Sequence, residues 1–192
     1  MDIMLADGTT IIVGTFGIEQ AGSVKLKASN QVAINNSYIT MEAFSQEVNA
    51  GNGGDLTVEA ADIVLSDDTQ IVVETRGVGQ AGSVKLAASE WVTVNNSAIR
   101  LATTSWDENA GNGGDLTIDA MDIKLADQTQ IVAGTSSAGQ AGSGKLTAGK
   151  QVEMNNSFIM MATSSNETNA GKGGDLTIDA TNIVLALSLI HI

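Results

Sequence analysis

The sequence predicts an all-β fold: a right-handed single-stranded parallel β-helix, or β-solenoid, of about six coils of about 30 residues with three strands per coil. Three observations predict it. The 192-residue chain repeats every 60 residues, from positions 1, 61, 121 and 181. Each repeat divides into two similar halves, and apolar residues recur at period two without a helical stripe. The right hand follows from the general preference of parallel β crossovers.

The two halves of each repeat share the pattern [DN]-x-[ST]-x-Ile. It begins as DGTTI at residue 7 and returns as NNSYI at residue 35, and later copies begin at 67, 95, 127 and 155. The steps alternate between 28 and 32 residues, so two unequal coils make one repeat. Three coils of 20 residues per repeat would not explain why the two halves of each repeat are similar. A left-handed hexapeptide helix would need a six-residue period, which the sequence lacks.

Along the first unit we expect strands around residues 3–5, 11–13 and 24–26, and along the second around 32–34, 39–41 and 56–58. Strands this short bury a face only if equivalent strands of successive units stack in parallel, ~4.8 Å apart. Stacking predicts two apolar columns of β-branched residues. One contains Ile3, Val32, Ile63, Val92, Ile123, Val152 and Ile183, and the other Ile11, Ile39, Ile71, Ile99, Ile131 and Ile159.

Short polar residues mark the corner between the first and second strands of each coil. The short side chain of an Asx-turn accepts a hydrogen bond from the backbone two residues on. Alternation of Asp with Asn keeps the carboxylates two coils apart, ~9.6 Å, where their repulsion in water is roughly 0.4 kcal/mol. The asparagines also fit the N-x-[ST] glycosylation pattern. The predicted structural turn residues are Asp7, Asn35, Asp67, Asn95, Asp127 and Asn155.

A glycine-rich loop, NAGNGGDLTIDA at 109–120, has close copies at 49–60 and 169–180. We interpret it as the long corner of every second coil, with glycines that supply positive φ. A calcium site needs several converging carboxylates, whereas the aspartates here face serines in neighbouring coils, and a phosphate loop needs a following helix. The structural glycines are Gly53, Gly54, Gly113, Gly114, Gly173 and Gly174, and the alternating pairs are Asp55, Asp115 and Asp175 with Ser23, Ser83 and Ser143.

Composition argues against several classes of function. A net charge of -13 disfavours nucleic acid, and no apolar run approaches the ~20 residues of a membrane helix, so no membrane insertion is expected. The chain has no cysteine, and its one histidine, His191, stands in the tail. We therefore predict no cofactor, metal site or catalytic residue and a non-enzymatic protein. A β-helical polysaccharide lyase or hydrolase, the alternative, would need clustered carboxylates with a basic partner.

One outward stripe is a candidate for partner contact. Outward positions of the second strands carry apolar residues, interrupted by Arg100 and Gln70. A contiguous apolar patch would mark a partner or glycan-contact face. These residues are Ile12, Tyr38, Val72, Val132, Phe158 and Met160. The third strands instead predict a solvated face of alternating charge, with Lys25, Thr57, Lys85, Thr117, Lys145 and Thr177.

The string VKLAASEWVTVNNSAIRLAT, followed by AGNGGDLTIDA, resembles the repeats of filamentous-haemagglutinin-like exoproteins, adhesins exported by two-partner secretion. The resemblance covers residues 1–185. It implies a right-handed parallel β-helix, an outer-membrane translocator as export partner, and a role in adhesion. The family's secretion domain carries Asn-Pro motifs, and this sequence has no proline.

We therefore expect a fragment of a longer protein: a structural shaft segment of a secreted or cell-surface adhesin that contributes to contact with a surface glycan or protein ligand. A carbohydrate-active enzyme fragment and a passive spacer are the alternatives. Residues 1–185 form the predicted repeat segment. Residues 186–192 are predicted to be an aberrant, non-native tail, because Leu187 replaces the expected Asp and LSLIHI resembles translated adapter DNA.

Overall fold

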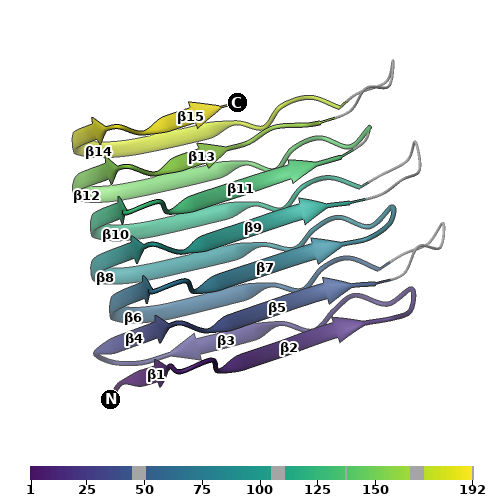
Figure 1. The fold of residues 1–192 in the computed structure, drawn as a ribbon, viewed down its shortest axis with the longest axis horizontal. Coiled ribbons are helices and arrows are strands. Elements are labelled where there is room, and N and C mark those ends of the chain that lie inside the picture. The colour runs from purple at the N-terminus through teal and green to yellow at the C-terminus, as the bar shows by residue number, and fades with distance from the viewer. Residues whose placement is uncertain (45–50, 105–110, 137, 165–170, 192) are drawn as a thin grey trace.

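The chain folds as an all-β parallel solenoid of about five turns of about 31 residues, close to the six turns predicted. The computed structural model describes residues 1–44, 51–104, 111–136, 138–164 and 171–191. Two parallel sheets face each other, and the turns stack from the N-terminal end to the C-terminal end (Figure 1). The prediction of a parallel β-solenoid is confirmed, while its right hand stays a prediction.

Strands of the two sheets alternate along the chain, except that β3 and β4 follow each other in the same sheet. The eight-stranded sheet contains β1 (Ile3–Leu5), β3 (Val24–Lys27), β4 (Gln31–Asn35), β6 (Leu56–Ser66), β8 (Val84–Asn95), β10 (Leu116–Ala126), β12 (Gly144–Asn155) and β14 (Leu176–Ala186). The seven-stranded sheet contains β2 (Thr10–Thr15), β5 (Tyr38–Ala43), β7 (Gln70–Thr75), β9 (Ala98–Thr103), β11 (Gln130–Thr135), β13 (Phe158–Met160) and β15 (Leu189–His191).

Each turn contributes to two sheets and not to three separate strands, because the predicted third strand usually continues into the first strand of the next unit. In β6 this continuity passes through a bulge, where the N–H groups of Ala61 and Asp62 both donate to the Asn30 carbonyl at 2.9 Å. Only β3 and β4 remain separate.

The core consists of the predicted columns. Ile3 pairs with Val32, Val32 with Ile63, and the same register continues to Ile183. The isoleucine column of the seven-stranded sheet runs unbroken from Ile11 through Ile159. In the central turns these side chains are fully buried. The period-two alternation therefore identified the inward face of both sheets correctly.

The short polar corners lie where they were predicted, but two kinds alternate. The Asx-turn hydrogen bond expected at Asn95 is wrong, because its Oδ1 is buried without a partner among the described residues. Asp67 and Asp68 both have positive φ (52° and 67°), whereas the next corner has a single such residue, Asn96 (44°). Aspartate and asparagine tolerate this left-handed conformation better than most residues. The same alternation recurs along the chain, at Asp7 and Gly8, Asn36, Asp127 and Gln128, and Asn156.

Hydroxyl groups close these corners. The Thr69 hydroxyl shares its one proton between the carbonyl oxygens of Ser66 at 2.8 Å and Ile34 at 2.9 Å, so it joins two turns. Asn35 contributes between turns, since its Nδ2 donates to Asp67 Oδ2 at 2.6 Å. An amide thus separates successive carboxylates, in agreement with the predicted alternation of Asp and Asn.

The glycine-rich corner is explained by close approach of the backbones. Gly8 is the one described glycine with positive φ, so the expectation that Gly53, Gly54, Gly113, Gly114, Gly173 and Gly174 supply positive φ is wrong. A Cβ on Gly54 would instead overlap the Gly22 carbonyl oxygen, and one on Gly82 would overlap that of Gly54. Glycine is required because successive corners stack with no space for a side chain.

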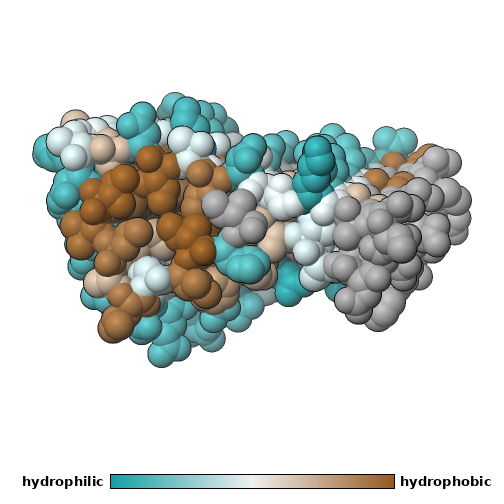
Figure 2. All heavy atoms as spheres, turned by 90° about the horizontal axis from the view of Figure 1, so that it is seen from above, coloured by the Kyte–Doolittle hydropathy of each residue, from teal (hydrophilic) through white to brown (hydrophobic). Residues whose placement is uncertain are grey.

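The last turn continues the solenoid through His191. Ile190 pairs with Ile159, and Leu187 adopts a φ of 50° at the position of Asp127. A leucine in this conformation costs roughly 1–2 kcal/mol. Figure 2 shows apolar surface gathered at this end, where Leu185 and Leu189 are exposed. That residues 186–192 are non-native stays a prediction, and residue 192 lies outside the described residues.

We expect Gly82→Ala to destabilise the solenoid by about 2 kcal/mol or more, because its Cβ would push two stacked backbones apart. Gly17→Ala is the matched control, since the nearest atom to its added Cβ is 3.9 Å away and its φ is not positive. Chemical unfolding followed by circular dichroism measures both. Equal effects of the two substitutions would contradict the explanation by close approach.

Candidate functional site

The predicted contact residues lie on the outer face of the seven-stranded sheet, in two adjacent columns. One column runs Ile12, Thr40, Val72, Arg100, Val132 and Met160. The other runs Thr10, Tyr38, Gln70, Ala98, Gln130 and Phe158. Ile12 is 67% exposed and the other apolar members of the stripe are partly buried. The register therefore brings the stripe onto one face, but polar residues alternate with the apolar ones.

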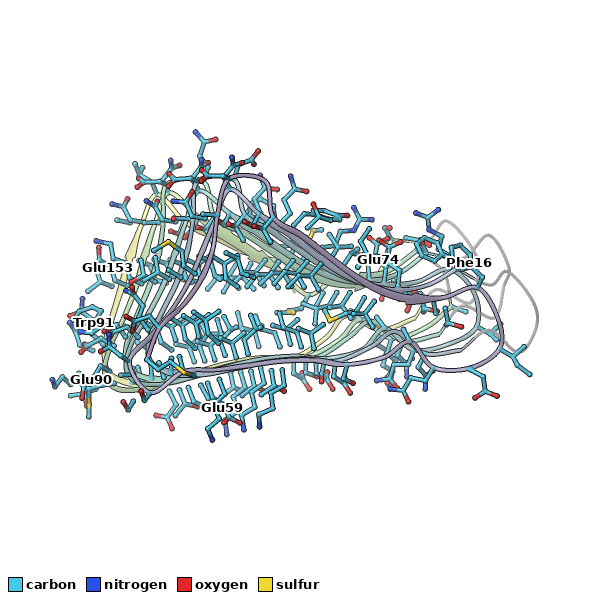
Figure 3. All side chains as sticks on the ribbon, turned by 90° about the horizontal axis from the view of Figure 1, so that it is seen from below. Phe16, Glu59, Glu74, Glu90, Trp91 and Glu153 are labelled. Carbon is cyan, nitrogen blue, oxygen red and sulfur yellow. The ribbon has the colours of Figure 1, made fainter. Side chains whose placement is uncertain are left out.

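A pair of stacked glutamates lies next to this stripe, and the sequence reasoning missed it. Glu42 of β5 and Glu74 of β7 are in register on adjacent strands, and each is less than a tenth exposed. Glu74 lies on the outer side of its sheet, opposite to the face that carries Glu59 (Figure 3). The same column has Gly14, Ala102 and Gly134 in other turns, so the pair is a departure from the repeat.

Both arginines of the chain pair with these glutamates. Arg100 Nε lies 2.5 Å from Glu74 Oε1, and Arg76 Nη2 lies 3.8 Å from Glu42 Oε2. The Thr40 hydroxyl donates to Glu42 Oε1 at 2.5 Å. Each guanidinium is about half exposed while the carboxylates are covered. The site thus consists of two buried glutamates, each paired with a half-exposed arginine on the outer side.

Burial is the largest influence on the pKa of Glu74. It raises the pKa of Glu74, and Glu42 one strand away raises it further, while Arg100 and Arg76 act in the opposite direction. Burial also raises the pKa of Tyr38, with Glu42 as the next cause. The Glu42 carboxylate, one strand spacing away, thus adds to the effect of burial on the pKa of Glu74.

An aromatic column adjoins the glutamates where the strands of this sheet end. The rings of Phe16 and Phe44 stack with centroids 4.9 Å apart and planes 15° apart. The Arg76 guanidinium lies 5.3 Å from the centroid of Phe44, within the range of a cation–π contact. Phe16 is 85% exposed. Arg76 therefore links the exposed aromatic column to the buried carboxylate of Glu42.

The face predicted to be solvated is confirmed on the eight-stranded sheet. Lys25, Thr57, Lys85, Thr117, Lys145 and Thr177 form one column. Glu59 pairs with Lys25 at 2.8 Å and with Lys27 at 2.9 Å, and these hydrogen bonds lower its pKa to about 2. Within the described ranges, no three His, Asp or Glu side chains converge as metal ligands, and no helix is long and apolar enough to cross a membrane.

Comparisons with known proteins identify no relative: no family model, no curated protein and no solved structure matches the chain.

We predict that Arg100→Gln raises the pKa of Glu74 further, because it removes the largest influence that lowers this pKa. Arg76→Gln is the control and should raise it less. Side-chain carboxyl NMR during a pH titration measures both. Since the folded pKa exceeds the ordinary 4.5, the folded state binds the proton more tightly, and stability should fall as the pH rises from 4.5 through the folded pKa. A lower Glu74 pKa in Arg100→Gln would contradict this account.

Proposed function

We propose that the chain is a non-enzymatic shaft segment of a large secreted or cell-surface adhesin. The observation that carries the proposal is the continuous parallel pairing of strands from turn to turn in both sheets, which stacks equivalent turns along one axis. A stack of this kind grows by simple addition of turns and holds its outward columns at a fixed spacing. Such an architecture suits a spacer that projects a contact surface.

The contact surface of the proposal is the outer face of the seven-stranded sheet. Departures from the repeat gather there, including the glutamate–arginine pairs and the aromatic rings of Phe16 and Phe44. Arginine and aromatic side chains are the groups that most often dominate binding at protein surfaces. The stripe from Ile12 to Met160 adds apolar area beside them.

The resemblance to filamentous-haemagglutinin-like repeats supports the extracellular part of the proposal. It favours export through an outer-membrane translocator, followed by contact with a glycan or protein on another surface. The net charge of -13 agrees with a partner that is not nucleic acid. A passive spacer would share this fold and have no affinity of its own.

The full chain tests the contact proposal when it is applied to a glycan array and to cultured cells. A variant with serine at Ile12, Tyr38, Val72, Val132, Phe158 and Met160 should bind at least about tenfold more weakly, because it loses the apolar stripe. The control replaces outward apolar residues of the other sheet, Met4, Val64 and Val184, with serine. Circular dichroism shows whether each variant is folded.

Loss of binding in the stripe variant alone would support the proposal. Equal loss in the folded control would move the contact away from the stripe. No binding by the parent chain would leave the passive spacer.

A polysaccharide lyase or hydrolase is the second candidate, and the pairing of Glu42 with Glu74 is the observation that favours it. Both carboxylates, however, are already engaged by Arg76, Arg100 or Thr40. If the chain is an enzyme, it should release sugar ends from a panel of polysaccharides, and Glu42→Gln and Glu74→Gln should each abolish that release. Unchanged release in both variants would exclude this pair as the catalytic groups.

A further inference from the structure

A polar cavity of about 220 Å³ opens at the corner where the chain passes from the seven-stranded sheet to the eight-stranded sheet. It spans four successive turns, since Gln20 lies before β3 and Asp115 lies before β10. It is separate from the stripe and from the glutamate pair. The side chains that the argument uses are Gln20, Asn52, Asp55, Gln80, Ser83 and Asp115.

Backbone forms part of the cavity lining, at Gly53 and Gly82. A Cβ on Gly82 would overlap the Gly54 carbonyl oxygen, and a Cβ on Gly53 would lie 2.8 Å from the Gly82 nitrogen. Since these corners stack without space for a side chain, only backbone atoms of Gly53 and Gly82 line this part of the hollow. The glycine corners that hold the turns together therefore also shape a concave surface.

Hydrogen bonds fix the side chains of the lining. Asn52 Oδ1 accepts from the Gln80 N–H at 2.8 Å. Asp55 Oδ1 accepts from the Ser83 N–H at 2.8 Å and from the Ser83 hydroxyl at 2.7 Å. Among the described residues, Asp55 Oδ2 and Asn52 Nδ2 have no partner. One acceptor and one donor, both held by oriented side chains, are thus available to a ligand.

The same arrangement recurs one repeat later. Asn112 Oδ1 accepts from the Gln140 N–H at 2.9 Å, and Asp115 Oδ1 accepts from the Ser143 N–H at 2.8 Å. Two strand spacings separate the copies, which is ~9.6 Å along the axis. The polar groups therefore form a straight row whose period is two turns.

We propose that this row binds an extended β-linked polysaccharide that carries no acidic groups. The disaccharide unit of such a chain has nearly the length of two turns, so equivalent hydroxyls meet equivalent amides in successive copies. Carboxylate and amide side chains are suitable partners for sugar hydroxyls because they accept and donate hydrogen bonds. Asp55 and Asp115, in a chain of net charge -13, disfavour anionic glycans.

The third repeat defines where the row ends. Lys172 stands at the position of Asn52 and Asn112, so the amide is replaced by an ammonium group. We therefore assign the binding row to the first two repeats. Each copy alone offers few hydrogen bonds, and affinity depends on simultaneous contact with both copies.

This inference does not rest on the adhesin proposal, because it concerns another face of the solenoid. The stripe variant described above should retain groove binding. Loss of one activity without the other would therefore separate the two proposals.

NMR of the full chain with cello- and chito-oligosaccharides of two, four and six sugars tests the inference. Amide shifts should appear at Gly53, Gly82 and Ser83 and at their copies one repeat later. The hexamer should bind at least about tenfold more tightly than the dimer, because it can span both copies. A heparin fragment of equal length serves as the anionic probe and should bind more weakly.

The groove variant replaces Asn52 and Asn112, both exposed, with aspartate, which keeps the acceptor oxygen for Gln80 and Gln140 and removes the free donor, and it should lose at least about tenfold in hexamer affinity. The matched control replaces Gln70 and Gln130, outward amides of the seven-stranded sheet, with glutamate. No shifts with millimolar hexamer, equal affinity for all lengths, preferential binding of heparin, or unchanged binding in the groove variant would each overturn the inference.

Discussion

Backbone hydrogen bonds between successive turns are the interaction on which this structure depends. They place each residue one strand spacing, ~4.8 Å, from its equivalents above and below, so that each position must tolerate a copy of itself or a suitable partner. Isoleucine meets this condition in the core, and glycine meets it at the tight corner. Asn35 meets it beside Asp67 by a hydrogen bond. Glu42 and Glu74 do not meet it by themselves, and the chain places its two arginines beside them.

The columns of the core could be predicted because two periods agree. The alternation of apolar residues selects the inward face, and the 60-residue repeat fixes which residues stack. The bulge in β6 could not be located in this way. Alanine is compatible with a bulge and with a strand end, so Ala60 and Ala61 do not distinguish the two. The role of Gly54 was misassigned because sequence shows that a side chain is excluded and does not show whether conformation or a neighbour excludes it.

The candidate site was predicted only in part, for a related reason. The stripe from Ile12 to Met160 follows from alternation within each strand, and the register of the sheet confirms that its members share a face. Glu42 and Glu74 were not predicted because the prediction used positions that recur in every repeat, and these two glutamates do not recur. The available signal was the exception itself, a glutamate where other turns have glycine or alanine, together with the only two arginines.

Alternation of the two kinds of corner limits how the solenoid can change in length. Neighbouring turns differ, with two left-handed residues in one and a single one in the next, so the smallest insertion that preserves every contact is a pair of turns. Duplication or deletion of one 60-residue repeat in the gene would add or remove such a pair. Each event would change the reach of the molecule by ~9.6 Å and leave its cross-section unchanged. Length is then a trait that selection can adjust in discrete steps, without a new packing solution at any of them.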